Sequence, residues 1–467
     1  MLAALVGVQL AAGLLLRGAW DLWAQSAVLL GLIVGLTLWI SAGAVRGRLA
    51  LPSSAPARWA AALAALSFAS AYFGPVRAYA LPAWAASAAG LGLIPAATLL
   101  SAGERRRVEQ VLRAVAWVLV LLAVYQHFHG VERPPASLLN QNVFAGAILL
   151  LLPIAARRGD PLLVAGLLLC LWWSRSVGAW LGLSVALVLH RRSVGPFAFW
   201  AGAVAGFAGL VAAYAKLQSP EVLHRLAWWT AVWRMSCDAP WRGLGPGAFA
   251  YALPAYAAAR PELSTLFAHQ YFLETAAERG WPYLVLWLGG LGFILRRAQP
   301  SKRFGPVAAL AHGLVDYALS VPGVFWLFCL SVAWSLPESE DSVAVPVGRK
   351  IPALAATLAV AGGVAFWVAG NWSADRLRAR VFNDSASLAP ARALTLLASS
   401  EDIRPHPEAA RARAEILIAS ADGPNAGRRL EAAAAHLRRA ISMDPYRESN
   451  RVLLEDVLRR LAHPGGS

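Results

Sequence analysis

The sequence has few charged residues for its length. Asp, Glu, Lys and Arg make up 15% of the 467 residues, whereas about 25% is usual in soluble globular domains. Acidic residues are the scarcest, with 26 Asp and Glu against 42 Lys and Arg, and the net charge is +16. Together with a hydrophobic content of 58%, this composition excludes an ordinary soluble protein.

Cysteine is also scarce, and no metal-site pattern is present. Cys170 and Cys329 lie in apolar runs, Cys237 lies in a polar loop, and their spacing matches neither a metal site nor a disulfide framework. The polar loops contain no Asp-x-Asp pair. We therefore expect no metal and no cofactor.

The basic excess lacks the pattern of a nucleic-acid-binding protein. No soluble segment shows a basic stripe interleaved with stacking aromatic residues. The charge instead fits the enrichment of Arg and Lys in cytoplasmic loops and attraction to anionic lipids. We expect membrane lipids, and no nucleic acid, among the partners.

We expect the N-terminus to begin a membrane helix and not a secretory signal. Residues 1–20 lack a basic n-region and an A-x-A cleavage site, so we interpret them as part of a first membrane helix.

Apolar runs long enough for membrane helices recur along the chain. They predict an all-α polytopic membrane protein with about 12–13 transmembrane helices. The runs are 2–16, 24–45, 59–74, 81–101, 108–127, 142–156, 161–174, 176–190, 196–213, 274–295, 305–319, 321–336 and 351–370.

The basic residues in the short loops predict an orientation. With the N-terminus in the cytoplasm, the cytoplasmic loops hold 16 Arg and Lys residues. The short loops on the other side hold four, which are Arg17, Arg77, Arg133 and Arg175. Two longer polar regions, 214–273 and 371–467, then lie outside the cytoplasm.

These regions predict two domains. Residues 1–370 form a transmembrane domain with a large loop at 214–273, and residues 371–467 form an α-helical domain. The tail sequence "LEAAAAHLRRAISMDPYRESNRVLLEDVLRRL" resembles the junction of two tetratricopeptide repeats. A plain helical hairpin is the alternative, and either would serve as a structural module or as a docking site for a protein partner.

Several polar residues stand where the membrane should begin, and each has a structural and a functional interpretation. Arg175, in "WWSRSVGAW", is either a loop arginine that reaches the headgroups or an anion-binding group. Arg225, Trp229 and Trp233 share one helical face, which either lies on the membrane surface or binds substrate. The following "GLGPG" beside Arg242 could bind an anion through its amides.

Two further clusters lie in later segments. His269, with Glu274 and Glu278 after it, either enters a helix at headgroup level or takes part in chemistry. His312 and Asp316 are spaced i, i+4 and either form a buried pair or a functional site. Asn140 or Asn142 is expected to cap a helix.

The segments "LLNQNVFAG", "SRSVGAWLGL", "RLAWWTAVWRMSCDAPWRGLGPGAF", "AHQYFLETAAERG" and "HGLVDYALSVPG" together resemble the O-antigen ligase and polymerase superfamily. The resemblance covers roughly residues 105–335. It implies a multipass enzyme of the bacterial inner membrane that transfers a glycan from an undecaprenyl-diphosphate carrier to an acceptor. It further implies that Arg175 and Arg225 bind the diphosphate and that His269 is the base.

From this resemblance we expect metal-independent and inverting glycan transfer on the periplasmic face. Arg242 would be a third cation, Trp229 and Trp233 would contact the lipid carrier and sugar, and Glu274 or Glu278 would orient His269. Asp316 is also expected at the substrate site. The acceptor could be lipid A core, a growing glycan, a protein side chain or another polymer.

Two other functions stay open at this stage. A transporter or flippase of lipid-linked glycan could use His312 and Asp316 as a proton relay. A membrane-tethered scaffold could act through residues 371–467.

Overall fold

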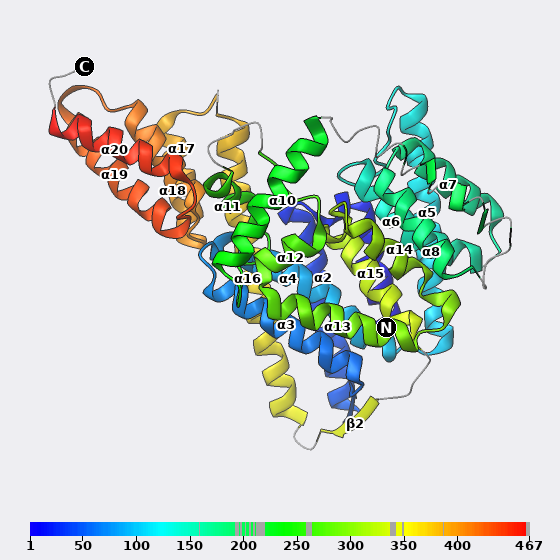
Figure 1. Ribbon diagram of the computed structural model, residues 1–467. Coiled ribbons are helices and arrows are strands. Elements are labelled where there is room, and N and C mark those ends of the chain that lie inside the picture. The colour runs from blue at the N-terminus through cyan, green and yellow to red at the C-terminus, as the bar shows by residue number, and fades with distance from the viewer. Residues whose placement is uncertain are drawn as a thin grey trace.

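The computed structural model describes residues 1–157, 159–191, 196, 199–200, 202–204, 207–208, 211, 220–257, 264–336, 342–347, 350–385 and 387–463. Its first part contains α1 (Leu2–Leu15), η1 (Arg17–Ala19), α2 (Leu22–Val45), β1 (Arg48–Pro52), α3 (Ala55–Phe73), α4 (Arg77–Thr98), α5 (Ala102–Phe128), α6 (Gln141–Arg157), α7 (Pro161–Ser174) and α8 (Val177–Leu189). The middle part contains α10 (Pro220–Asp238), α11 (Phe249–Tyr256), α12 (Tyr271–Arg279), α13 (Trp281–Arg297), η3 (Pro300–Lys302), α14 (Phe304–Gly313), η4 (Ala318–Ser320) and α15 (Pro322–Ser335). The last part contains β2 (Ser342–Pro346), α16 (Lys350–Asn383), α17 (Pro390–Ile403), α18 (Pro407–Ala419), η5 (Gly423–Asn425), α19 (Ala426–Met443) and α20 (Glu448–Ala462) (Figure 1).

Most described helices follow the predicted apolar runs, and the run at 196–213 lies mostly outside the described residues. Four described helices, α2, α4, α5 and α16, are long and apolar enough to cross a membrane alone. Others are short: a 14-residue helix such as α1 is about 21 Å long, less than the roughly 30 Å of a hydrocarbon core. The chain is thus an all-α polytopic membrane protein, and the number of crossings stays a prediction.

Three predicted runs have different boundaries in the structure. The run 274–295 is divided into α12 and α13 at Gly280, whose φ of 84° suits glycine. The run 305–319 ends as a helix at Gly313, so Asp316 lies in the connection after α14. The predicted domain boundary at 370 lies inside α16, because no proline interrupts this helix between Ala353 and Asn383.

A small ribbon is the exception to the all-helical prediction. β1 pairs with β2 in antiparallel register from Arg48 opposite Pro346 to Pro52 opposite Ser342. Lys350 Nζ also donates to the carbonyl of Val45 at 2.9 Å. The ribbon joins two loops that the charge pattern places on the same side of the membrane.

The loops predicted on the opposite side also lie together. Ser137 Oγ donates to Leu14 O at 2.8 Å, and Arg133 Nε donates to Ser174 O at 3.0 Å. In Figure 1 the ribbon lies at the lower end of the molecule, whereas α10, α11 and the tail helices lie toward the upper end. The loop groupings agree with the predicted topology.

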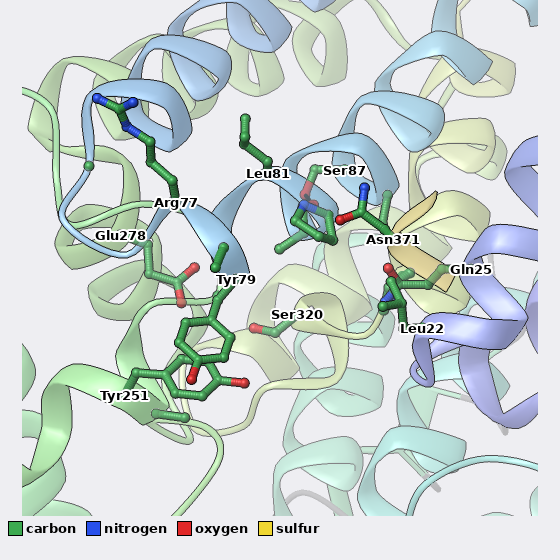
Figure 2. Close-up of a pocket in the computed structure, with 18 of the residues that line it drawn as sticks. Leu22, Gln25, Arg77, Tyr79, Leu81, Ser87, Tyr251, Glu278, Ser320 and Asn371 are labelled. Atoms are coloured by element: carbon green, nitrogen blue, oxygen red, sulfur yellow. Dashed lines mark hydrogen bonds between the residues drawn. The ribbon is translucent and has the colours of Figure 1, made fainter. Parts of the chain in front are cut away.

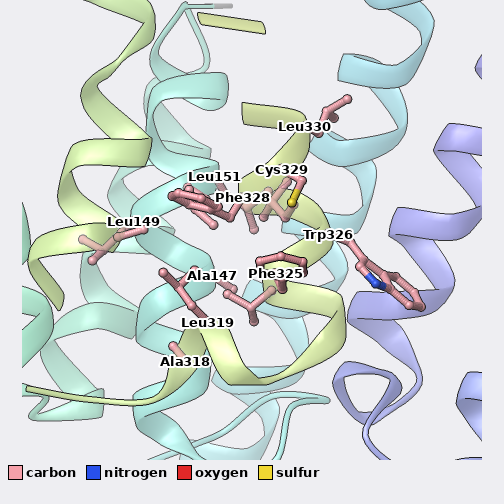
Figure 3. Packing of buried hydrophobic residues seen from close by; sticks show 14 of the residues in the cluster. Ala147, Leu149, Leu151, Ala318, Leu319, Phe325, Trp326, Phe328, Cys329 and Leu330 are labelled. Carbon is pink, nitrogen blue, oxygen red and sulfur yellow. The ribbon is translucent and has the colours of Figure 1, made fainter. Parts of the chain in front are cut away.

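The centre of the bundle is α15, which packs against α1, α4 and α6 (Figure 3). Trp326 is fully buried, and its Nε1 donates to Ala86 O at 2.8 Å. A Cβ on Gly13 or on Gly90 would lie 2.7 Å from this indole. Glycines on α1 and α4 therefore make the room that the tryptophan fills, an arrangement in which small residues permit close helix packing.

The tail is a series of helices in which each packs on the next. Val381 of α16, Leu397 of α17 and Ala409 of α18 share one apolar cluster. Ala414, Leu437 and Val457 share a second cluster across α18, α19 and α20. The predicted helix–turn–helix at Asp444–Pro445 is present as α19 and α20. Its identity as a tetratricopeptide repeat stays a prediction.

The substitution Gly13→Ala should destabilise the protein by about 1–3 kcal/mol, the usual effect of overpacking a tight core. Trp326 cannot move aside because its indole is hydrogen-bonded and enclosed. Thermal unfolding of the purified protein in detergent measures the effect. Gly292→Ala, at an exposed position of α13, is the matched control, since no atom lies within 4 Å of its added Cβ. Equal melting temperatures for the two variants would contradict this account.

Candidate functional site

His269 lies in a turn whose backbone is held by side chains on both sides. We call residues 265–270 the histidine turn. The N–H of Ala268 donates to Glu274 Oε2 at 2.7 Å, and its carbonyl accepts from Trp229 Nε1 at 3.0 Å. Gln270 Oε1 caps α12 through the Leu273 N–H at 2.5 Å. The φ of His269 is 55°, a left-handed conformation that costs energy in a non-glycine residue, so these contacts stabilise a strained backbone.

The imidazole of His269 lies between two aromatic rings. Trp228 stacks on it with a centroid distance of 5.2 Å, and Tyr317 meets it edge-on at 4.7 Å. Its Nδ1 is buried and faces Asp316 Oδ1 at 3.8 Å, too long for a hydrogen bond. The side chain is 18% exposed, so it is not completely closed off from solvent.

Burial lowers the pKa of His269 to about 4, the negative charge of Asp316 opposes this shift, and the positive charge of Arg225 adds to it. Arg225 approaches from α10, and its Nη1 donates to the carbonyl of Val315 at 2.9 Å. The imidazole is therefore neutral at pH 7, with one cation and one carboxylate beside it.

Asp316 joins two predicted clusters into one. Its Oδ2 lies 3.8 Å from Nε2 of His312, and its Oδ1 accepts from the Tyr317 N–H at 2.8 Å. The exposed fractions of His312 and Asp316 are 1% and 2%, so the expected buried pair is present. Because Asp316 also faces His269, it lies between the two histidines.

Glu274 is bound to protein groups on both oxygens. Besides the Ala268 N–H, it accepts from Ser320 Oγ at 2.6 Å. Its contact with His269 therefore runs through the backbone of the turn, whereas Asp316 is the carboxylate beside the ring. In the structure Glu274 therefore positions the turn without touching the imidazole, and its expected place at the substrate site stays a prediction.

The Gly-rich loop is bound to α12 and does not present free amides, which corrects the expectation of an anion loop. The N–H groups of Leu244 and Gly245 donate to the carbonyls of Ala277 and Glu278 at 2.9 and 2.8 Å. Glu278 Oε1 also accepts from the Phe249 N–H at 3.3 Å. The loop amides that could bind an anion are used to attach the loop to α12.

Three other predicted residues are exposed side chains in separate segments. Trp233 is 52% exposed and meets Trp281 edge-on. Arg242 is exposed, and no ion pair joins it to a described residue. Arg175 is 66% exposed, has a φ of 51°, and lies 3.4 Å from Glu132.

The start of α8, after Arg175, lies against the same segment as Arg225. A Cβ on Gly178, three residues later, would lie 2.8 Å from Val315 and 3.0 Å from His312. The side chain of Arg225 reaches the 312–316 region from α10, whereas that of Arg175 contacts Glu132, so a place for Arg175 at this site stays a prediction. No described contact joins Arg175 to His269.

Tyr317 was missed by the sequence reasoning. Its ring stacks on Phe267 at 4.1 Å, and its hydroxyl accepts from Asn140 Nδ2. Asn140, not Asn142, caps α6 by accepting from the N–H of Val143 at 3.0 Å. Only its position next to Asp316 could have indicated a role for Tyr317.

These features define a class: an all-α membrane protein with a half-enclosed site of one histidine, one buried carboxylate and one nearby arginine, Arg225. Among the described residues, no group of three or more His, Cys, Asp and Glu gathers in a metal-binding arrangement.

Residues 161–288 match the O-antigen ligase family, which supports the O-antigen ligase superfamily and a glycosyltransferase-like enzyme. The matched range includes Arg175, Arg225 and His269. No curated protein matches the chain.

Glu274→Ala should lower the free energy of unfolding by about 1–3 kcal/mol, because the buried Ala268 N–H loses its acceptor. Denaturant or thermal unfolding in detergent measures the loss. Glu274→Gln keeps one carbonyl oxygen and should be milder, and Glu455→Ala on the exposed face of α20 controls for the lost charge. A Glu274→Ala variant as stable as Glu455→Ala would rule out this anchoring role.

Proposed function

We propose that the protein transfers a glycan from an undecaprenyl-diphosphate-linked donor to a hydroxyl acceptor at the periplasmic face of the bacterial inner membrane. The observation that carries this proposal is the largely buried imidazole of His269, which lies between two aromatic rings and beside Asp316, with Arg225 bound to the neighbouring Val315. The family match over the same segment supports the reaction class.

In this reaction the acceptor oxygen attacks the anomeric carbon as the bond to the diphosphate breaks. The leaving diphosphate develops negative charge, so the site needs fixed cations there. Arg225 and Arg175 take this role, because a guanidinium is always charged and binds two phosphate oxygens at once. Arg242 is a more distant candidate for the same substrate group.

His269 acts as the general base. Its Nδ1 faces Asp316, which favours a proton on that nitrogen. The lone pair of Nε2 is then free to take the proton from the acceptor hydroxyl. Asp316 then stabilises the imidazolium that forms. Direct displacement inverts the anomeric configuration, and the arginines supply the charge stabilisation without a metal.

The aromatic face of α10 contacts the carrier. Trp233 is exposed one turn beyond Trp229, and aromatic side chains are favoured at the membrane interface. A lipid-linked donor presents its diphosphate at this level, which is why the reaction centre lies where the bundle meets the large loop.

His269→Ala should reduce transfer by about 10²–10⁴-fold, the usual contribution of a general base. Purified variants are assayed in vesicles with a labelled undecaprenyl-diphosphate glycan and envelope extract as acceptor. His463→Ala at the end of α20 is the control and should keep full activity. Transfer at the wild-type rate by a folded His269→Ala protein would remove the histidine from the mechanism.

The pH profile should reflect the lowered pKa of His269. As the pH falls from 7, transfer should stay nearly constant until the pH approaches 4, where half of the His269 rings are protonated. The unfolded chain gains this proton already near 6.5, so the stability of the folded state decreases between about pH 6.5 and 4. Each sample is therefore returned to pH 7 to confirm that it has stayed folded. Loss of activity with a midpoint near 6.5 would contradict the buried, neutral histidine.

A further inference from the structure

A large cavity lies between the membrane bundle and the tail. Its volume is about 890 Å³, within the roughly 300–1,000 Å³ typical of ligand pockets. We call it the tail cavity. Its walls come from the first residues of α2, α4 and α15, from α11 and α12, from the outer part of α16, and from the connection between α17 and α18.

The lining of the tail cavity combines aromatic rings with neutral polar groups. Tyr79 and Tyr251 stack with a centroid distance of 3.4 Å, and Figure 2 shows their rings together at one end. Gln25, Ser87 and Asn371 lie on the wall between α2, α4 and α16. Flat rings beside amides and hydroxyls are suited to a ligand with both C–H faces and many hydroxyls.

Acidic and basic side chains line the cavity in equal numbers. They are Arg77, Arg279, Arg378 and Arg404 with Glu274, Glu278, Asp375 and Glu408. Arg279 pairs with Glu278 at 3.3 Å, and Arg378 pairs with Asp375 at 3.2 Å. Two of the four arginines are thus bound to acidic groups of the protein, which favours a hydroxyl-rich ligand over a diphosphate, because a diphosphate requires cations that are free to bind it.

Two buried polar atoms of the lining residues have no hydrogen-bond partner in the described part of the chain. They are Oη of Tyr79 and Nε of Arg404. A buried group of this kind costs about 1–3 kcal/mol unless a partner is supplied. Sugar hydroxyls both donate and accept, and they would supply such partners.

One layer of aromatic rings separates the cavity from the proposed base. Leu266 and Phe267 of the histidine turn line the cavity, and Phe267 stacks on Tyr317, whose ring meets His269. Glu274 and Ser320 line the same wall. A ligand in the cavity would therefore contact the turn that carries His269.

We propose that the tail cavity binds the sugar portion of a lipid-anchored glycan acceptor, and that the tail forms one wall of this site through Arg378, Arg404 and His406. The inference rests on the proposed transfer reaction and names its acceptor class. The lipid anchor is inferred from the apolar residues Leu81, Pro82 and Phe325, which line the cavity from α4 and α15, two helices of the membrane bundle. The tail thereby helps select the acceptor.

Photocrosslinking in the full-length protein tests this assignment in cells of its native background. The photoreactive residue p-benzoylphenylalanine is introduced at Tyr79 in one variant and at Asn371 in another. Two variants are used so that the test remains possible if one of them does not fold. Val452, which is 56% exposed on α20, is the matched control position. Adducts are purified under denaturing conditions, digested, and analysed by mass spectrometry and glycan staining.

A sugar-containing lipid adduct without a polyprenyl diphosphate is expected at Tyr79 and Asn371 and not at Val452. An adduct that carries polyprenyl diphosphate would assign the cavity to the donor and overturn the inference. A phospholipid without sugar, a protein, or no adduct at either position would also overturn it.

The same crosslinking in a His269→Ala background separates this inference from the proposed reaction. The adduct should persist there, because binding needs no catalysis. If glycan adducts form but His269→Ala still transfers glycan at the wild-type rate, the mechanism fails and the cavity assignment stands. If transfer is lost in His269→Ala but no glycan adduct forms in either background, the reaction stands and the assignment fails.

Discussion

The arrangement of the site depends on the carboxylates of α12 and the backbone groups they bind. Glu274 accepts from Ala268 and so holds the histidine turn, and Glu278 accepts from Phe249 next to the Gly-rich loop. A buried carboxylate without such partners would be costly, and a buried N–H without an acceptor would be costly as well. The two carboxyl groups of one short helix therefore find hydrogen-bond donors in two loops and hold these loops in place. The position of His269 follows from the contact that Glu274 makes.

The electrostatics of the site follow from this fixed position. The ring of His269 is enclosed by Trp228 and Tyr317, and burial keeps it neutral at pH 7. Asp316 raises its proton affinity, and Arg225 lowers it. A base that is neutral before the reaction, beside a carboxylate that stabilises the cation afterwards, has the protonation states that proton transfer requires.

The histidine turn also connects two regions with different chemistry. On the side of α10, Arg225 reaches the 312–316 segment, and an anionic leaving group could be stabilised there. On the other side lies a cavity with two internal ion pairs and stacked tyrosines, closed by residues from α16 and the α17–α18 connection. In the proposed reaction the donor and the acceptor would meet at the turn, and a tail outside the matched family segment would shape the acceptor site.

The sequence by itself determined the helical membrane class, because a long apolar run in lipid must satisfy its own backbone hydrogen bonds, and a helix does so. It also determined the helix–turn–helix at Asp444–Pro445. It also singled out His269, Arg225 and Asp316, since charges near the membrane need a reason. Only the tertiary structure decided which of two carboxylates faces His269, because Asp316 is 47 residues away in sequence. The hydrogen bonds between the Gly-rich loop and α12, and the cavity beside the tail, likewise depend on contacts between distant segments. The local periodicity of the sequence does not encode such contacts.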